Sequence, residues 1–371
     1  MQELKITASN AHPSVEDERQ WLRLVAPYRQ AQVGKSIWQV TSTLLGYVAG
    51  WLVMLWSLYW NLPCGYLLTL LLAVPTGLLL VRLFIIQHDC GHRSFFHSRA
   101  ANDTVGLLLS VLTYTPYLCW RKQHAAHHAT SGDLDRRGRG GEIMTMTVRE
   151  YREAGWLKRL GYRLYRNPLV LFVVAPFYYF MIEQRFTFGV PKAWKKERAN
   201  VHFTNLALLA FTTLLVWSVG WLSTHSSASS FDAPVTTAKV LWTGCKIFLM
   251  VQLPIVIVGS SAGVWLFYVQ HQYEDTYWRN RSEWSYVEAA LYGSSYYRLP
   301  KVLQWFTANI GLHHIHHLDS RIPNYRLQNC LDDNPELNCA PTLSVWKSLS
   351  CATLKLWDED ERQMVGFPRS L

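Results

Sequence analysis

Residues 120–128 read WRKQHAAHH and contain three closely spaced histidines, His124, His127 and His128. Their i, i+3 and i+4 spacing places them at neighbouring positions on one face of a helix. Two further blocks have helical spacing, HDCGH at 88–92 and HHIHH at 313–317. A single histidine pair on a helix is commonly an exposed polar pair or a hydrogen-bonded core group. Three such blocks in one chain favour a shared metal site, and the fold must then bring them together.

The composition is typical of a membrane protein. Half of the 371 residues are apolar, and many stand in long runs that a set of soluble domains would not show. The 17 tryptophans and 19 tyrosines fit the same class, because these side chains gather at the membrane–water interface. The net charge of +10 could indicate nucleic-acid binding, but 18 of the 36 Lys and Arg residues lie between Arg93 and Arg198. This uneven distribution favours positively charged cytoplasmic loops instead.

Four apolar runs are long enough, at ~1.5 Å per residue, to cross ~30 Å of hydrocarbon as helices. They are residues 37–60, 66–87, 201–222 and 247–269. The connections at 61–65 and 224–238 contain no Lys or Arg, so we expect them to face outward. The cytoplasmic parts are then 88–200 and 270–371, and together they contain all three histidine blocks.

Two shorter apolar runs are not expected to cross the membrane. Residues 104–118 contain Pro116, residues 168–182 contain Pro176, and each run reaches only about 22 Å as a helix. We predict a re-entrant or interfacial helix for the first run and an in-plane helix for the second. A full crossing at 104–118 would separate the first two histidine blocks onto opposite sides of the membrane.

The prediction for residues 1–371 is therefore a single all-α, multi-pass membrane domain. It has four transmembrane helices, in-plane or re-entrant helices, and a cytoplasmic helical cap that carries the histidines. The basic stretch 131–166 contains a glycine-rich turn, RRGRGG at 136–141. We interpret this stretch as a solvated loop against anionic headgroups, with a docking site for an electron donor as the alternative. The N-terminus lacks the apolar core of a cleaved signal peptide, so we expect it to be cytoplasmic.

The histidine set is too large for one metal ion, because such sites take about four ligands. Two metals are the natural count, and imidazole suits Zn, Cu, Fe and Ni alike. The zinc-protease pattern HExxH is absent, and no glutamate has a histidine three residues later as in soluble di-iron bundles. The seven cysteines form no CxxC pair and are interpreted as reduced thiols without a chemical role. An all-histidine dinuclear centre at a membrane surface is suited to activating O2 against a C–H bond of a lipid chain.

The three blocks, together with QHQYEDTYW at 270–278, resemble the integral-membrane fatty acid desaturase family. The similarity covers about residues 40 to 330 and is to the acyl-lipid, Δ12 (omega-6)-like branch. It implies a fatty acid desaturase with two non-haem Fe ions. Such an enzyme uses O2 and two electrons to introduce a cis double bond into a membrane-lipid acyl chain. The first block has three residues between its histidines, which favours a lipid ester over a thioester substrate.

The resemblance implies the metal ligands by their position in the motifs. They are His88, His92, His124, His127, His128, His271, His313, His316 and His317. His314 stands at a variable position of its block and is not expected to be a ligand, and His97, His12, His202 and His225 are assigned structural or surface roles. Some family members have an asparagine where this chain has Phe267, so no asparagine ligand is transferred. Asp89, Asp275 and Asp319 are candidates to accept hydrogen bonds from ligand imidazoles and orient them.

The sequence has no His-Pro-Gly-Gly signature of a fused cytochrome b5 domain, so we expect a separate electron donor, ferredoxin or cytochrome b5. A basic cytoplasmic face would attract an acidic donor. The expected location is a bacterial cytoplasmic membrane with a cytoplasmic active site. A fatty acid hydroxylase or a carotenoid ketolase or hydroxylase on the same scaffold is the alternative function. A metal transporter is a distant one, because it would need ligands within the spans, which contain only Arg82 and Lys246 near their ends.

Overall fold

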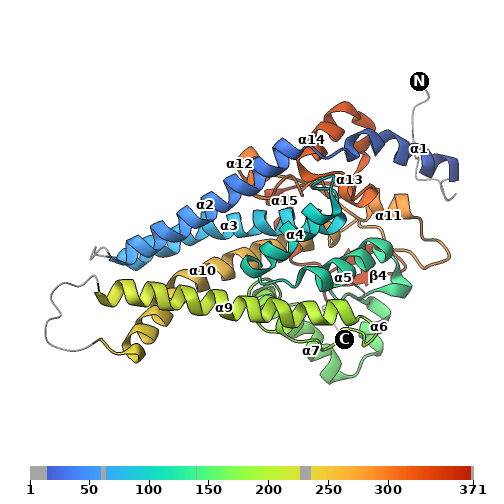
Figure 1. Ribbon diagram of the computed structural model, residues 1–371. Coiled ribbons are helices and arrows are strands. Elements are labelled where there is room, and N and C mark those ends of the chain that lie inside the picture. The colour runs from blue at the N-terminus through green and yellow to red at the C-terminus, as the bar shows by residue number, and fades with distance from the viewer. Residues whose placement is uncertain (1–14, 60–63, 139, 226–234, 369–371) are drawn as a thin grey trace.

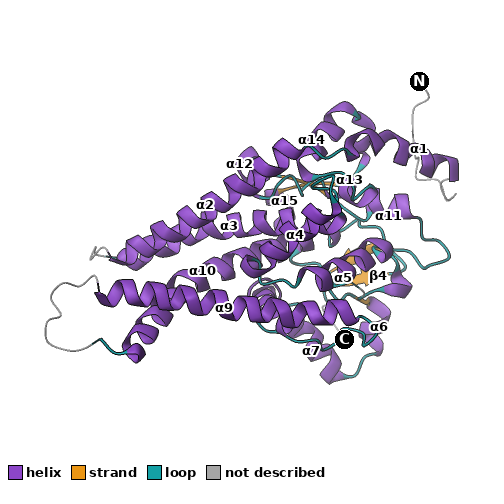
Figure 2. Ribbon diagram, viewed as in Figure 1, coloured by secondary structure: helices purple, strands orange, loops and turns teal. Residues whose placement is uncertain are grey.

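The computed structural model describes residues 15–59, 64–138, 140–225 and 235–368, and these are mostly helical (Figures 1 and 2). Four helices are long and apolar enough to cross a membrane, as the sequence predicts. They are α2 (Val33–Tyr59), α3 (Gly65–His92), α9 (Lys195–His225) and α10 (Thr237–His271). The outward connections predicted at 61–65 and 224–238 lie largely outside the described residues.

The long helices pack side by side, with α3 against α2 and α10, and α9 against α10. In Figure 1 they extend to the left, while the shorter helices and the strands gather toward the right. Helices α3 and α10 continue without a break beyond the predicted apolar runs, to His92 and His271. The first histidine block is therefore the last turn of a membrane-spanning helix, and His271 ends another.

Helices α9 and α10 cross at two glycines, Gly220 and Gly244, whose missing side chains let the backbones touch. A Cβ atom on Gly220 would overlap the carbonyl oxygen of Val240, and one on Gly244 would overlap that of Val216. Close approach at small residues is a common way for helices to pack in a membrane, where burial of apolar surface gives little drive.

We expect Gly220→Ala and Gly244→Ala each to destabilise the protein, because the added methyl group meets backbone that cannot rotate away. The cost should be ~1–3 kcal/mol, as for other overpacked sites. Gly161→Ala is the control, because an added Cβ there meets nothing within 4 Å. Thermal unfolding in detergent should show lower midpoints for the two crossing variants only, and equal midpoints for all three would contradict the packing argument.

The predicted interfacial run at 104–118 is broken into two helices, α4 (Arg99–Leu112) and α5 (Tyr117–Thr130). Between them Tyr114 takes a left-handed conformation with φ of 56°, and Pro116 precedes the first residue of α5. Helix α4 has 14 residues and does not qualify as a span, so it does not separate the first two histidine blocks.

The second short run at 168–182 is part of a bent segment. Helix α7 (Trp156–Tyr165) is followed by the π-helix η3 (Val170–Val174), α8 (Ala175–Met181) and the 3-10 helix η4 (Glu183–Arg185). The two halves, 156–165 and 170–185, meet at 61°, as in a broken span or a re-entrant loop. The in-plane placement of this run stays a prediction.

The remaining elements cover the end of the bundle where α3 and α10 finish. The short helices are α1 (Val15–Val25), η1 (Ala26–Arg29), η2 (Leu134–Arg136), α6 (Val148–Glu153), α11 (Tyr286–Tyr292), α12 (Lys301–Phe306), α13 (His313–Leu318), α14 (Asn324–Asp333), η5 (Pro335–Cys339) and α15 (Val345–Cys351). Strands β1 (Met146–Thr147), β4 (Leu356–Asp358) and β5 (Gln363–Val365) form one small sheet, with β1 parallel and β5 antiparallel to β4. Strands β2 (Tyr296–Arg298) and β3 (Thr342–Ser344) form a parallel pair.

Candidate metal centre

The structure gathers the three histidine blocks and His271 into two adjacent clusters. The first histidine cluster consists of His88, His92, His124, His128 and His316. The second histidine cluster consists of His127, His271, His313 and His317. Within each cluster every residue offers a ring nitrogen that lies within 4.8 Å of the others. The nine residues are those that the family motifs indicate.

Helix geometry explains how the blocks are divided. Side chains at positions i and i+4 of a helix point in directions about 40° apart, whereas those at i+3 and i+4 point about 100° apart. His124 and His128 accordingly share the first cluster, while His127 of the same helix belongs to the second. In α13 the division is reversed, because His313 and His317 lie in the second cluster and His316 in the first.

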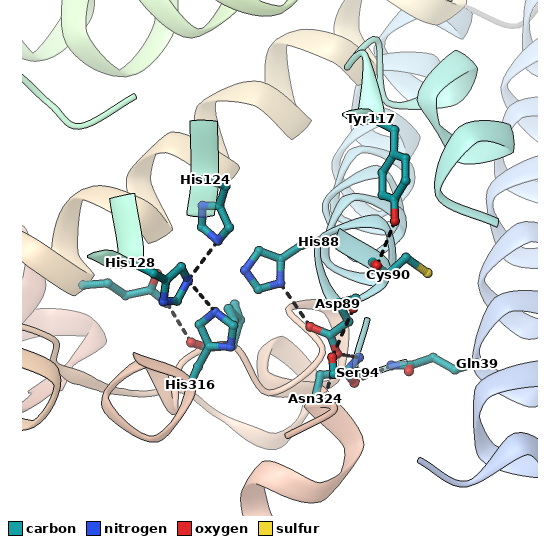
Figure 3. A network of polar contacts seen from close by, with 12 residues as sticks. Gln39, His88, Asp89, Cys90, Ser94, Tyr117, His124, His128, His316 and Asn324 are labelled. Carbon is teal, nitrogen blue, oxygen red and sulfur yellow. Dashed lines mark hydrogen bonds and ion pairs between the residues drawn. The ribbon is translucent and has the colours of Figure 1, made fainter. Parts of the chain in front are cut away.

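The ring nitrogens converge as they would around a shared cation. Nε2 of His128 lies 3.1 Å from Nε2 of both His124 and His316 (Figure 3). Nε2 of His271 lies 3.0 Å from Nε2 of His313 in the second cluster. His92 and His128 are partly exposed and the other seven are buried. Nine imidazoles that present lone pairs to two common points are a suitable donor set for two metal ions.

Burial keeps several of these imidazoles in the neutral form that binds metal, namely His124, His127, His128, His316 and His317. Desolvation lowers the pKa of His127 to about 3, and nearby His88 adds to the effect. Burial first, and neighbouring imidazoles second, hold the pKa values of His124, His128, His316 and His317 well below the usual range. The lone pairs are thus available at neutral pH without competition from protons.

Asp89 fixes the orientation of His88 in the first cluster. Its Oδ1 lies 3.0 Å from Nδ1 of His88, and its Oδ2 accepts hydrogen bonds from the backbone and side-chain nitrogens of Asn324 at 2.7 and 2.8 Å. Asn324 in turn accepts a hydrogen bond from Nε2 of Gln39 at 2.8 Å. This buried network, drawn in Figure 3, links α3 to α14 and α2. The geometry is that of a carboxylate that orients a ligand histidine.

The other two candidate carboxylates lie elsewhere. Asp275 is exposed. Asp319 is buried, but its side chain accepts hydrogen bonds from Arg29 at 2.5 Å and Arg321 at 2.9 Å. Among the described residues neither carboxylate pairs with a cluster histidine.

Two partners of the second cluster were not expected from the sequence. Oε1 of Glu142 lies 3.3 Å from Nδ1 of His127, and the backbone oxygen of Gly293 lies 3.0 Å from Nδ1 of His271. A backbone acceptor leaves no sequence signal. Glu142 was detectable only as an acidic residue directly after the glycine-rich turn, within a basic stretch.

Phe267 occupies the position where some family members have an asparagine. Its ring centroid lies 5.1 Å from that of His127 and 5.2 Å from that of His271. This chain therefore places an apolar ring against the second cluster, at a position where it supplies no polar ligand.

The histidines that were assigned other roles lie outside both clusters. His314 is fully buried and its ring faces Tyr296, with centroids 6.0 Å apart. His97 is exposed and lies beyond the end of α3 at His92. His202 and His225 are exposed on α9, and His12 lies outside the described residues.

A cavity of about 560 Å³ begins at the clusters and extends between the spans. His88, His124 and His313 belong to its lining, and most of the other lining residues are apolar and come from α3, α10, η3 and α8. Its polar lining residues include Gln123, Glu142 and Glu183. On α10 the lining runs from Gln270 to Val256, which lie fourteen residues apart, or ~21 Å along the helix. A mostly apolar cavity beside an all-histidine site, among four helices long enough to span a membrane, is suited to an integral-membrane metalloenzyme.

The comparisons with known proteins identify the family. The model of the fatty acid desaturase family matches residues 65–341. A fatty acid desaturase of Bacillus subtilis (strain 168) is 41% identical over 350 residues, which is 94% of this chain and 91% of the relative. The chain therefore belongs to the fatty acid desaturase family and is an enzyme of that kind.

More distant relatives carry more specific names. An sn-1 acyl-lipid omega-3 desaturase (ferredoxin) of Synechocystis is 27% identical over 264 residues, 69% of this chain and 64% of the relative. An sn-1 oleoyl-lipid 12-desaturase of Anabaena variabilis is 25% identical over 286 residues, 73% of this chain and 70% of the relative.

Proposed function

We propose that this enzyme introduces a cis double bond into the acyl chain of a membrane lipid, with Δ12 (omega-6)-like regiochemistry. The observation that carries the proposal is the apolar cavity, which runs past the histidine clusters and along α3 and α10. A straight acyl chain fits such a channel with its reacting carbons beside His88, His124 and His313. The oleoyl-lipid 12-desaturases among the relatives support the regiochemistry.

The nine cluster histidines would hold two iron ions, five imidazoles at one and four at the other. When bound, the iron pair supplies the redox chemistry that activates O2. Desaturation removes two hydrogens from adjacent carbons and, with two electrons and two protons, converts O2 into two waters.

The protein's own contribution is position and exclusion of water. Phe84, Val81 and Leu266 belong to the apolar lining that keeps the chain extended and dry beside the clusters. Asp89 holds His88 in a fixed tautomer at the edge of this cavity. Fixed ligands and a shaped channel restrict reaction to the carbons that lie at the clusters.

The electrons would come from a separate acidic carrier, ferredoxin or cytochrome b5, that docks on the cytoplasmic parts 88–200 and 270–371, of which 88–200 has the excess of basic residues. One relative's name includes ferredoxin, which supports this class of donor. We place these residues on the cytoplasmic side of a bacterial membrane, within a single domain of residues 1–371. Lateral access from the bilayer would favour a lipid ester over a soluble thioester.

The test is expression in a host that makes only saturated and monoenoic fatty acids, followed by gas chromatography and mass spectrometry of its lipids. A new diene with a cis bond at the twelfth carbon is the expected product. A hydroxylated acid, or an oxidised carotenoid in a pigmented host, would instead support the alternative activities on this scaffold. Dienes in which the new bond lies elsewhere would overturn the Δ12 assignment alone.

A further inference from the structure

The glycine-rich turn at 136–141 is not a solvated loop throughout, because one of its glycines packs onto the helix of the second histidine block. Gly138, Gly140 and Gly141 all have positive φ, at 75°, 70° and 85°. A Cβ on Gly138 or Gly141 would meet nothing within 4 Å. A Cβ on Gly140 would overlap the backbone nitrogen of His127 and lie 2.6 Å from the backbone oxygen of Gln123. The turn therefore touches α5 directly, at a point that only glycine can occupy.

Side-chain contacts hold the turn on either side of this point. Arg137 donates hydrogen bonds to the backbone oxygens of Leu134 and Thr145, both at 2.9 Å, and pairs with Glu150 at 2.6 Å. The hydroxyl group of Thr145 donates to Oε1 of Gln272, at the end of α10, at 3.1 Å. The turn is thus fixed to its own flanks and to the helix that ends in His271.

This anchoring delivers Glu142 to the second histidine cluster. The Glu142 side chain is 10% exposed and that of His127 is 1% exposed, and Oε1 lies 3.3 Å from Nδ1. That distance is within ion-pair range, although the contact is not a hydrogen bond, and among the described residues neither ring nitrogen of His127 nor Oε2 of Glu142 has a hydrogen-bond partner. Glu142 also lines both the large cavity and a smaller one beside His271 and Phe267.

We propose that Glu142 is a positioning residue of the second metal site and that Gly140 seats it there. With a metal ion bound, a small turn of the carboxylate would let it accept the Nδ1–H of His127, so that the Nε2 lone pair points toward His271, His313 and His317. Asp89 makes the corresponding contact with His88 in the first cluster, at 3.0 Å. Each cluster then has one histidine oriented by a carboxylate, an arrangement that raises imidazole basicity and metal affinity. The inference rests on the proposed iron-binding function of the two clusters.

The experiment measures iron in the purified, full-length holoprotein during a chelator challenge, by elemental analysis and Mössbauer spectroscopy. In E142A we expect one iron of the pair to leave about 10–100-fold faster than in the wild type, while the other is retained. E142Q keeps a neutral acceptor of the same shape and should lie between E142A and the wild type. Loss of one specific iron is a result that general destabilisation would not produce.

Alanine substitutions at Gly140 and Gly138 provide a matched pair of variants that tests the contact of the turn with α5. G140A and G138A share the strain of a positive φ, but only G140A forces the turn away from α5. G140A should lose the same iron as E142A, and G138A should retain both. Should G140A fail to fold, the E142Q and E142A series tests the carboxylate alone.

Retention of both irons by E142A at the wild-type rate would overturn the proposal while leaving the proposed desaturation intact. Equal iron loss in G138A and G140A would overturn the role of Gly140. A wild-type protein that purifies correctly folded but takes up no iron would overturn the proposed metal function itself, and this inference with it.

Discussion

His128→Ala is expected to reduce desaturation by on the order of 100-fold or more, because changes behind a ligand alone cost about 10–100-fold. His128 lies at the centre of the first cluster, within 3.1 Å of both His124 and His316. Its loss leaves a gap among converging nitrogens that no neighbouring side chain fills. Product formation in the expression host and iron per chain in the purified protein should fall together.

Two histidines outside the clusters are controls for this substitution. His97→Ala changes an exposed side chain, and His314→Gln changes a buried one in the same helix as three cluster histidines. Both variants should keep wild-type iron content and turnover. Loss of iron in His314→Gln with an unchanged fold would show that His314 also belongs to the metal site.

Gly263→Phe is expected to abolish activity by filling the cavity while leaving the metal site intact. Gly263 lines the cavity on α10, and an added Cβ would meet nothing within 4 Å, so a large side chain enters the channel rather than a packed interface. An acyl chain that cannot pass this point cannot reach the clusters. We expect at least ~100-fold less product, comparable with the ligand variant, but full iron content.

Gly263→Ala is the matched control, because it has the same backbone and only one additional methyl group. It should retain most of the activity, with product chain lengths close to those of the wild type. Equal activity of the alanine and phenylalanine variants on the same substrate pool would mean that the acyl chain does not occupy this cavity.

The fold was largely predictable because its main determinants are local. Apolar runs of sufficient length gave all four spans, and the spacing of the histidine blocks gave three helical segments. The exact helix ends were not predictable, because α3 and α10 continue into residues that are polar but buried by the cap. The break at Tyr114 depends on a left-handed residue that no glycine marks.

The composition of the candidate site was predictable, but its division was not. Motif positions indicated the nine histidines, yet which ones share a cluster depends on how α3, α5, α10 and α13 are placed around each other. The carboxylates beside the cluster histidines were also only partly predictable from the sequence. Asp89 adjoins His88 in sequence, whereas Glu142 reaches His127 only because Gly140 folds back onto α5.

The unbroken course of α3 and α10 has a consequence for how the enzyme tolerates its surroundings. Both helices contribute residues to the lining of the cavity, and both have histidines at their C-terminal ends. A bilayer that thickens on cooling, or thins on warming, can tilt these helices or shift them along the membrane normal, but it does not change their length. The distance between the middle of the cavity and the histidine clusters is thereby insulated from changes in bilayer thickness.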